Sequence, residues 1–297
     1  MRVLKGHGTE NDFLVLPDLD AAIALTPQLV RALCDRHAGI GADGVLRVVR
    51  SENDPDASHM AAAAPYFMDY RNADGSLAEM CGNGIRVYLR YLQGAGLVGH
   101  DAAVATRGGI KCVRSGGGGD VTVDMGQPVV LADRPVVTAA CASAMPAAAT
   151  VLMPNPHVVV WMDSPEALQA LWLGSPPSVE PGRPDGQNVE FVARGGPRHL
   201  ILRVHERGSG ETRSCGTGIC AAVVAAATAD GCAADGQPWR VDVPGGSCQV
   251  TWRGDGELQL TGPAVILAEI EVDDAWLAGL AGTAGTAGTA GTAGTAG

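Results

Sequence analysis

The chain has 297 residues, of which 46% are hydrophobic and 18% charged, so it can build a large core and is not a disordered protein. Its 21 Lys and Arg against 32 Asp and Glu give a formal net charge of −11, which argues against a nucleic-acid binder because phosphate needs a positive surface. No apolar run reaches the roughly 18 residues of a membrane span, and no signal peptide is apparent, so we expect a cytoplasmic protein without membrane or nucleic-acid partners.

Short β-branched or alternating runs between Gly and Pro predict strands, and longer periodic runs predict helices. In chain order we expect a strand at 13–16, a helix at 27–36, a strand at 45–49, a helix at 84–92, a strand at 120–124, a helix at 164–173, strands at 189–192 and 200–205, a helix at 218–229, and strands at 240–243 and 249–252. Strands outnumber helices, which predicts an α+β fold.

One order of landmarks occurs twice along the chain. Cys81-Gly82-Asn83-Gly84-Ile85 recurs as Cys215-Gly216-Thr217-Gly218-Ile219, and each copy is followed by a Gly-Gly pair and a further Cys. We therefore predict two similar halves, 1–133 and 150–264, each with many short strands around the helix that begins at its motif. A linker is expected at 134–149, residues 265–278 can return to the first half, and the Ala-Gly-Thr repeat at 281–297 is expected to be disordered.

Each motif places a cysteine at the start of a predicted helix. There the unpaired backbone N–H groups and the positive end of the helix dipole favour anions, so we expect a lowered thiol pKa. The glycines carry no Cβ, so a substrate carboxylate could approach the backbone of the same turn. A single motif could equally be a helix cap with a structural cysteine, but two matched copies favour a functional site.

Two thiols that face each other can do what one cannot. One removes a proton from a stereocentre as a thiolate while the other donates a proton to the opposite face, which inverts the configuration. Two helix N-termini would stabilise the carbanion, so no cofactor is expected. The only lysines are Lys5 and Lys111, and neither has the context of a pyridoxal-phosphate site. The histidine spacing predicts no metal site.

At these residues the chain resembles the diaminopimelate epimerase family. The resemblance runs from Lys5 to about Asp273 and rests on the ordered motifs Gly8–Phe13, Asn72–Ser76, Cys81–Arg86, Asn155–His157, Asn188–Phe191, Glu206–Gly208 and Cys215–Gly218. It implies two pseudo-symmetric domains, each a mostly antiparallel, barrel-like sheet around a central helix, and a homodimer. It also implies interconversion of L,L- and meso-diaminopimelate in lysine and peptidoglycan-precursor synthesis, without a cofactor.

Carried over by position, the resemblance makes Cys81 the proton donor and Cys215 the proton acceptor in one direction, with His157 and Glu206 adjusting their protonation. The carboxylate at the reacting centre would be bound by backbone N–H groups of Gly82, Asn83, Gly216 and Thr217. The other end of the substrate would be held by Asn11, Asn72, Asn155, Asn188 and Arg207, since amide and guanidinium groups suit a carboxylate. The backbone near Glu206 and Arg207 could accept from the distal ammonium group. Some relatives have Gln at the position of Gly44, and 51–65 looks like a loop insertion.

Other interpretations of these residues remain open. Asn11 and Asn155 could be turn or cap residues, Asn72 could belong to a turn, and Glu206 with Arg207 could be a surface pair. A racemase of proline, hydroxyproline or histidine would keep both thiols without a clamp for a distal carboxylate. A hydrolase would use one cysteine as a nucleophile with His157, and a non-catalytic member would only bind amino acids. The remaining cysteines are expected to be packing thiols, at positions 34, 112, 141, 220, 232 and 248.

Overall fold

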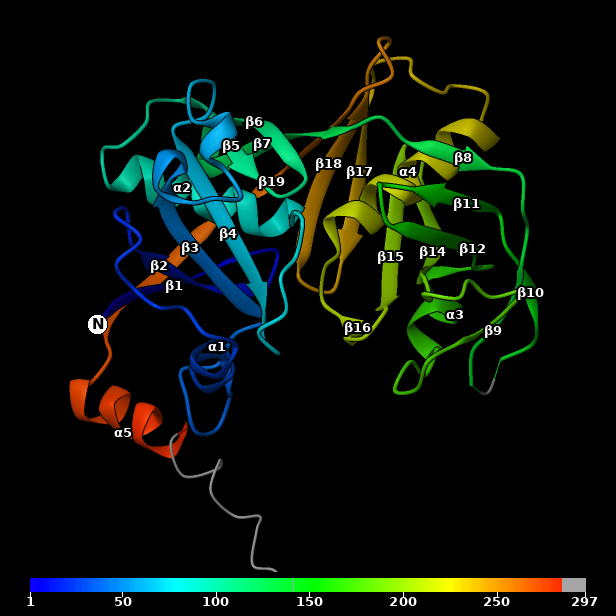
Figure 1. The fold of residues 1–297 in the computed structure, drawn as a ribbon. Coiled ribbons are helices and arrows are strands. Elements are labelled where there is room, and N and C mark those ends of the chain that lie inside the picture. Colours follow the sequence, from blue (N-terminus) through cyan, green and yellow to red (C-terminus); the bar gives the residue numbers. More distant parts are fainter. Residues whose placement is uncertain (141, 285–297) are drawn as a thin grey trace, which may run out of the picture.

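The computed structural model describes residues 1–140 and 142–284, and these form two lobes, each built around one central helix (Figure 1). The first lobe contains β1 (Arg2–Gly8), β2 (Asn11–Pro17), α1 (Pro27–Cys34), β3 (Gly44–Arg50), η1 (Ser51–Asn53), η2 (Ser58–Met60), β4 (Tyr66–Asn72), α2 (Gly82–Gly94), β5 (Asp101–Thr106), β6 (Gly109–Ser115), η3 (Gly117–Gly119) and β7 (Asp120–Gly126).

The chain then crosses to the second lobe through β8 (Val129–Leu131), which pairs with β11 (Ala149–Leu152). This lobe contains β9 (Val136–Thr138), β10 (Met145–Pro146), β11 (Ala149–Leu152), β12 (Pro156–Trp161), α3 (Pro165–Ala170), β13 (Ser178–Glu180), β14 (Asn188–Gly196), β15 (His199–Glu206), β16 (Gly210–Thr212), α4 (Gly216–Ala229), β17 (Pro238–Val243), β18 (Gly246–Trp252) and β19 (Leu258–Pro263). The chain ends with β20 (Val265–Glu271) and α5 (Asp274–Ala284).

The two lobes repeat one strand arrangement. In the first, β2 and β3 run parallel with Phe13 beside Gly44, and in the second β12 and β14 run parallel with His157 beside Asn188. The following strand pairs antiparallel in both lobes. β4 pairs with β3, with Tyr70 opposite Leu46, and β15 pairs with β14, with Val204 opposite Glu190. The predicted α+β fold with two similar halves is confirmed.

Each central helix is buried by the strands that surround it. Residues 82–89 of α2 are all buried, and α4 is buried along almost its whole length. An Ala- and Val-rich helix that is apolar on every side requires such a position. Apolar residues of both helices belong to one continuous core cluster, so the lobes share a core.

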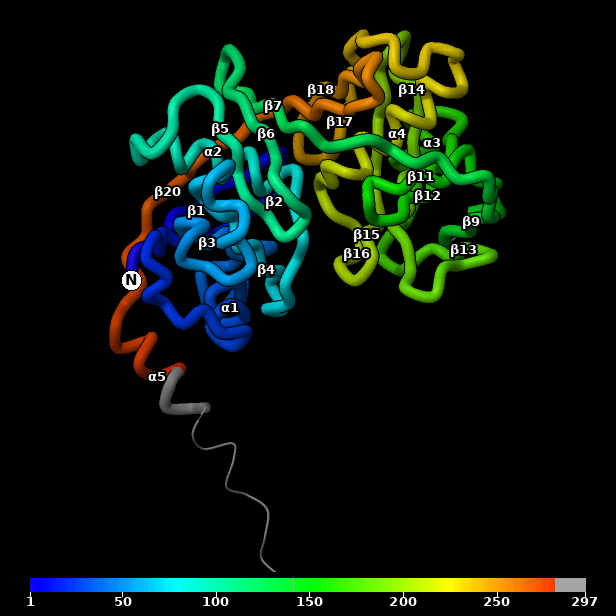
Figure 2. Tube along the Cα trace, turned by 45° about the horizontal axis from the view of Figure 1, so that its top comes forward, coloured from blue at the N-terminus to red at the C-terminus, as the bar shows by residue number. Residues whose placement is uncertain are grey.

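Strand pairing also joins the lobes. β19 pairs with β7, where the hydroxyls of Thr122 and Thr261 lie 2.8 Å apart, and β20 returns to pair with β1 (Figure 2). α5 then lies near α1, where the Gln28 side chain donates to the Leu280 carbonyl at 3.2 Å. The segment 134–149, expected to be a linker, carries β9 and β10, which form a small sheet with β13.

All the predicted strands and helices exist, but several of their boundaries differ. α2 and α4 each begin two residues earlier than predicted, because the cysteines serve as N-caps and both glycines that follow lie inside the first turn. α3 is shorter than 164–173, because its C-cap Leu171 is already extended.

The prediction of disorder from residue 281 onward is wrong for 281–284, which continue α5. The Asp273 side chain accepts from the Trp276 N–H at 2.9 Å at the start of this helix, and alanine favours its continuation. Residues 285–297 lie outside the described part of the chain.

Two features are absent from the described residues. Among residues 1–140 and 142–284, no helix is both long and apolar enough to cross a membrane. Within the same ranges, no group of three or more His, Cys, Asp and Glu side chains is arranged to hold a metal ion.

Candidate active site

The two cysteine motifs meet where the lobes touch. Cys81 is the N-cap of α2, Cys215 is the N-cap of α4, and the first turns of the two helices lie against each other. A Cβ placed on Gly216 would come within 3.3 Å of the Gly82 Cα and 3.1 Å of Leu260. The missing side chains therefore allow the two turns to approach, a role that the sequence did not reveal.

Side-chain hydrogen bonds tie these turns together. The Asn83 amide donates to the Asn11 side chain at 3.2 Å and to the Ser214 carbonyl, next to Cys215, at 3.1 Å. The Ser214 and Thr9 hydroxyls lie 2.7 Å apart across the same junction. Asn83 is only 1% exposed, so its side chain fixes the two lobes together.

Cys81 has both a donor and an acceptor at its sulfur. Its Sγ accepts from the Gly84 N–H at 3.3 Å, and the thiol donates to Asn11 Oδ1 at 3.7 Å. Asn11 in turn donates to Asp43 at 2.7 Å, which fixes the orientation of its amide. The structure thus brings Asn11, Asn83 and Cys81 together.

Cys215 lies in a more acidic environment. Its Sγ is 3.5 Å from the Thr217 hydroxyl, and its thiol hydrogen-bonds to Glu206. Glu206 also accepts from Thr212, and burial raises the pKa of this carboxyl. Glu190 is a second carboxyl close enough to act on Cys215 electrostatically.

The expected lowering of the thiol pKa values is wrong in this structure. Burial raises the pKa of Cys81 to about 11, although the N–H groups of Gly84 and Asn83 and the Arg86 cation oppose the shift. Burial also raises the pKa of Cys215 well above its ordinary value, and the charges of Glu206 and Glu190 add to this shift. The helix N-termini act as predicted, but the loss of water outweighs them.

His157 and Asn155 lie on the Cys215 side of the site. His157 and Glu190 are both fully buried, and the His157 Nδ1 is 2.6 Å from Glu190 Oε1. The other ring nitrogen, Nε2, is 3.1 Å from Asn155 Oδ1. Among the described residues, neither ring nitrogen of His157 has a hydrogen bond to a thiol.

The other predicted residues occupy nearby strand ends. Asn188 accepts from the Arg207 N–H at 2.9 Å, while the exposed Arg207 guanidinium donates to the Asp185 carbonyl at 2.7 Å. Asn72 donates to the Ser76 hydroxyl at 3.0 Å within a turn.

Gly44 is flanked by an aromatic ring. A Cβ at this position would come within 2.5 Å of the Arg71 carbonyl and 2.8 Å of the Tyr70 ring. Tyr70 is almost buried and packs edge-on against Phe13. A larger side chain at position 44 therefore does not fit this chain as it stands.

Sequence reasoning missed several residues that build the site. Arg86 is fully buried and bonds the Gly82 carbonyl at 3.2 Å and the Thr9 hydroxyl at 3.2 Å, and it lowers the pKa of Cys81. Ser214, Thr9 and Glu190 were also missed. Arg86, Thr9 and Glu190 stand within the quoted motifs, and Ser214 directly precedes one of them, but only the three-dimensional contacts reveal their roles.

The remaining cysteines differ in exposure. Cys34, Cys220 and Cys248 are buried as expected for packing thiols, and Cys232 is partly buried. Cys112 is exposed, so its assignment as a packing thiol is wrong: alternate residues of the β6 strand face solvent. Cys141 lies outside the described residues.

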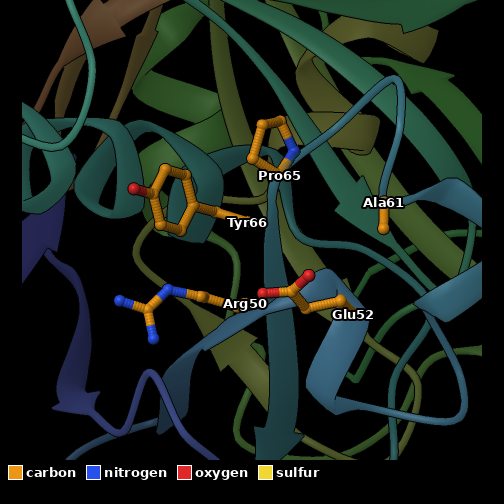
Figure 3. A pocket seen from close by; sticks show the side chains of 5 residues that line it. All are labelled: Arg50, Glu52, Ala61, Pro65 and Tyr66. Carbon is orange, nitrogen blue, oxygen red and sulfur yellow. The ribbon is translucent and has the colours of Figure 1, made fainter.

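A surface pocket lies elsewhere on the first lobe. Arg50, Glu52, Ala61, Pro65 and Tyr66 line it, and in Figure 3 the Arg50 and Glu52 side chains stand below the Tyr66 ring and Pro65. These residues belong to or flank the 51–65 segment, and none is a predicted site residue. The pocket is therefore separate from the paired cysteine motifs.

Comparisons of sequence give a consistent result. The family model for diaminopimelate epimerase matches residues 3–131 and 149–267. A diaminopimelate epimerase of Streptomyces coelicolor is 56% identical over 283 residues, covering 93% of this chain and 96% of the relative. One from Thermobifida fusca is 48% identical, covering 92% and 98% of the two chains.

Solved structures of similar fold have much lower sequence identity. A phenazine biosynthesis protein of the PhzF family from Bacillus anthracis has a TM-score of 0.70 at 16% identity, covering 92% of this chain and 99% of that chain. A hydroxyproline epimerase from Agrobacterium vitis has a TM-score of 0.61 at 15% identity, covering 91% of each chain. At such identities the likeness concerns the fold alone.

Proposed function

The chain belongs to the diaminopimelate epimerase family, and we propose that Cys81 and Cys215 are the two acid–base groups with which it interconverts L,L- and meso-diaminopimelate. The observation that carries this proposal is the contact between the first turns of α2 and α4, each capped by one of the two cysteines. This arrangement suits a substrate carbon held between two thiols.

In the proposed reaction, one cysteine acts as a thiolate and takes the α-proton, so the substrate becomes an enolate-like carbanion. The other cysteine, as a thiol, gives its proton to the opposite face and is left as a thiolate. The proton and charge therefore balance, and the reverse reaction exchanges the two roles. We assign Cys81 as donor and Cys215 as acceptor in one direction of the reaction.

The backbone N–H groups of residues 82, 83, 216 and 217 would stabilise the substrate carboxylate as negative charge moves onto it. These groups stand at two helix N-termini, where the dipoles favour an anion. They supply the electrostatic stabilisation that would otherwise come from an electron-withdrawing cofactor, so the proposed reaction needs none.

The raised thiol pKa values require that something favours the thiolate when the reaction begins. Diaminopimelate brings an ammonium group at the reacting carbon, and a nearby cation stabilises a thiolate. Arg86 contributes in the same sense at Cys81. We propose that His157 and Glu206 adjust the protonation of Cys215, since Glu206 hydrogen-bonds to its thiol.

For the distal end of the substrate we propose a set of amide and guanidinium donors. Arg207 is exposed and its guanidinium is free to turn from a single backbone carbonyl toward a carboxylate. The proposed partners of the distal carboxylate and ammonium groups are Asn11, Asn72, Asn155, Asn188, Glu206 and Arg207.

A racemase of proline, hydroxyproline or histidine is the rival within the same fold. Relatives that share only the fold include a hydroxyproline epimerase at 15% identity, whereas diaminopimelate epimerases reach 56%. Initial rates of inversion on diaminopimelate and on these three amino acids test the assignment. We expect turnover of diaminopimelate alone, and absence of that turnover would overturn the proposal.

The hydrolase and binding-only interpretations have less support. A hydrolase needs a base next to its nucleophile, but the His157 nitrogens contact Glu190 and Asn155. A protein that only binds amino acids has no need of two matched thiols. Relatives of the chain are isomerases, and the chain is one as well.

We propose that the functional units are 1–133 joined by 265–278, and 150–264, with 134–149 between them. The two stretches matched by the family model, 3–131 and 149–267, support this division, as does the pairing of β20 with β1. A cytoplasmic location is also proposed, because both catalytic thiols must stay reduced.

A homodimer is supported by β20. Leu267 is 59% exposed and Val265 38% exposed on this strand, and among the described strands it pairs only with β1. Open strand edges with exposed apolar residues are usually covered in an assembly. Light scattering should find a dimer, and Leu267→Glu should give monomers.

A further inference from the structure

The two lobes differ in one pair of matched positions beside the helix N-termini. The shared strand register aligns Phe13 with His157 and Leu46 with Glu190. In the first lobe, Phe13 and Leu46 approach the α2 glycine, at 3.4 and 3.1 Å from a Cβ placed on Gly84. In the second lobe, Glu190 Oε1 would be only 2.6 Å from a Cβ on Gly218. An apolar pair in one lobe thus corresponds to an ionisable pair in the other.

Packing alone does not explain the ionisable pair. The first lobe demonstrates that Phe and Leu fill the equivalent space, and a buried ionic pair contributes little or nothing to stability compared with such residues. The second Glu190 oxygen, Oε2, is buried without any hydrogen-bond partner among the described residues. Leaving a carboxylate oxygen in that state costs free energy, so the pair is expected to serve another purpose.

The position of Glu190 suggests that purpose. Its carboxylate lies against the first turn of α4, where the helix dipole favours negative charge. One of its oxygens lies 2.6 Å from His157 Nδ1, and this contact holds the ring in its orientation. The titratable groups that face it are His157 from β12, Glu206 from β15 and Cys215 from α4.

We propose that Glu190 is a positioning residue, which holds His157 beside the first turn of α4 and makes the surroundings of Cys215 differ from those of Cys81. This inference rests on the proposed two-thiol function. It assigns the asymmetry between the thiols to one buried pair on the Cys215 side that has no counterpart on the Cys81 side.

Two variants separate the charge of Glu190 from its packing. Glu190→Gln keeps the shape and the acceptor for His157 but removes the charge. The double variant His157→Phe with Glu190→Leu copies the Phe13 and Leu46 pair, so it introduces a packing solution that the chain already uses. Ser51→Ala is the control, because it removes a buried hydrogen bond to the Ala64 carbonyl far from both motifs.

The first measurement is the rate of iodoacetamide alkylation of each cysteine against pH, followed by peptide mass spectrometry. For Glu190→Gln we expect the midpoint for Cys215 to move to lower pH while that for Cys81 stays in place. Equal shifts at both thiols, or no shift at Cys215, would overturn the proposal.

The second measurement is kcat and KM for diaminopimelate, with the melting temperature of each variant. The double variant should fold and lose about 10- to 100-fold in kcat, because a misplacement of about 1 Å near the reacting atoms can cost about 100-fold. A kcat within about twofold of the wild type would overturn the proposal. If the double variant does not fold, the alkylation result decides. Wild-type protein that fails to invert diaminopimelate would instead contradict the proposed function.

Discussion

Asn83 of one lobe donates its side-chain amide to the backbone carbonyl of Ser214 of the other, 3.1 Å away, and Ser214 directly precedes Cys215. Replacing Asn83 with Ala should cost about 1–3 kcal/mol in the free energy of unfolding, because buried partners lose their hydrogen bonds. We expect kcat to fall as well, since a misplacement of about 1 Å can cost about 100-fold.

Urea denaturation and initial-rate kinetics check both effects. Asn53→Ala is the matched control, because Asn53 is an exposed asparagine that donates to the Leu19 carbonyl at 3.1 Å far from the site. If Asn83→Ala behaved like this control, the hydrogen bonds across the junction would not align the thiols.

The contact between Gly82 and Gly216 leads to a second prediction. Gly216→Ala places a methyl group 3.3 Å from the Gly82 Cα and should separate the two first turns. Alanine is intrinsically better than glycine in a helix by about 1 kcal/mol, so kcat should fall more than stability does. Gly99→Ala, where a Cβ would meet nothing within 4 Å, should leave kcat unchanged. Equal kcat values for the two variants would contradict this account of the glycines.

The pKa shifts predict how the alkylation rate of each thiol depends on pH. Burial raises the pKa of Cys81 to about 11 and that of Cys215 well above its ordinary value, so both are protonated at neutral pH. Since the thiolate is the nucleophile, the alkylation rate of Cys81 should increase with pH up to about pH 11. The alkylation rate of Cys215 should increase only at higher pH. The exposed Cys112 is the reference thiol within the same protein. Alkylation of Cys81 that is already maximal near pH 8 would contradict the dominance of burial.

Arg207 should contribute to binding more than to the chemical step. Its proposed partner is the distal carboxylate, and a hydrogen bond to a charged group contributes about 1.5–3 kcal/mol. Arg207→Ala should therefore raise KM about 10- to 100-fold with a smaller change in kcat. Arg253→Ala removes an exposed arginine paired with Asp255 and should change neither constant. A normal KM for Arg207→Ala would remove this residue from the proposed substrate site.

The sequence was sufficient for the architecture because its signals are local or repeated. The periodic runs located the helices, and the second copy of the cysteine motif indicated both the two-lobed plan and the pairing of Cys81 with Cys215. Among the strands that were not predicted are β1, β4, β12 and β20, which are recognisable mainly by their partners.

The chemistry of the site depends on contacts that no local pattern contains. The helix N-terminus led to a prediction of a lowered thiol pKa, but burial by distant residues reverses the direction at Cys81 and Cys215. Glu190 and Arg86 have roles that become visible only once β14 and α2 are packed. The motif glycines were assigned to carboxylate approach, and the structure adds a second role, because Gly82 and Gly216 also let one helix approach the other.

The central claim is that two thiols act on one carbon, and the rate of L,L-to-meso inversion by Cys81→Ala and Cys215→Ala tests it most directly. Removal of a general acid or base costs about 100- to 10,000-fold, so each variant should lose at least about 100-fold relative to the wild type while remaining folded. Inversion by either variant within about tenfold of the wild-type rate would contradict the two-thiol account.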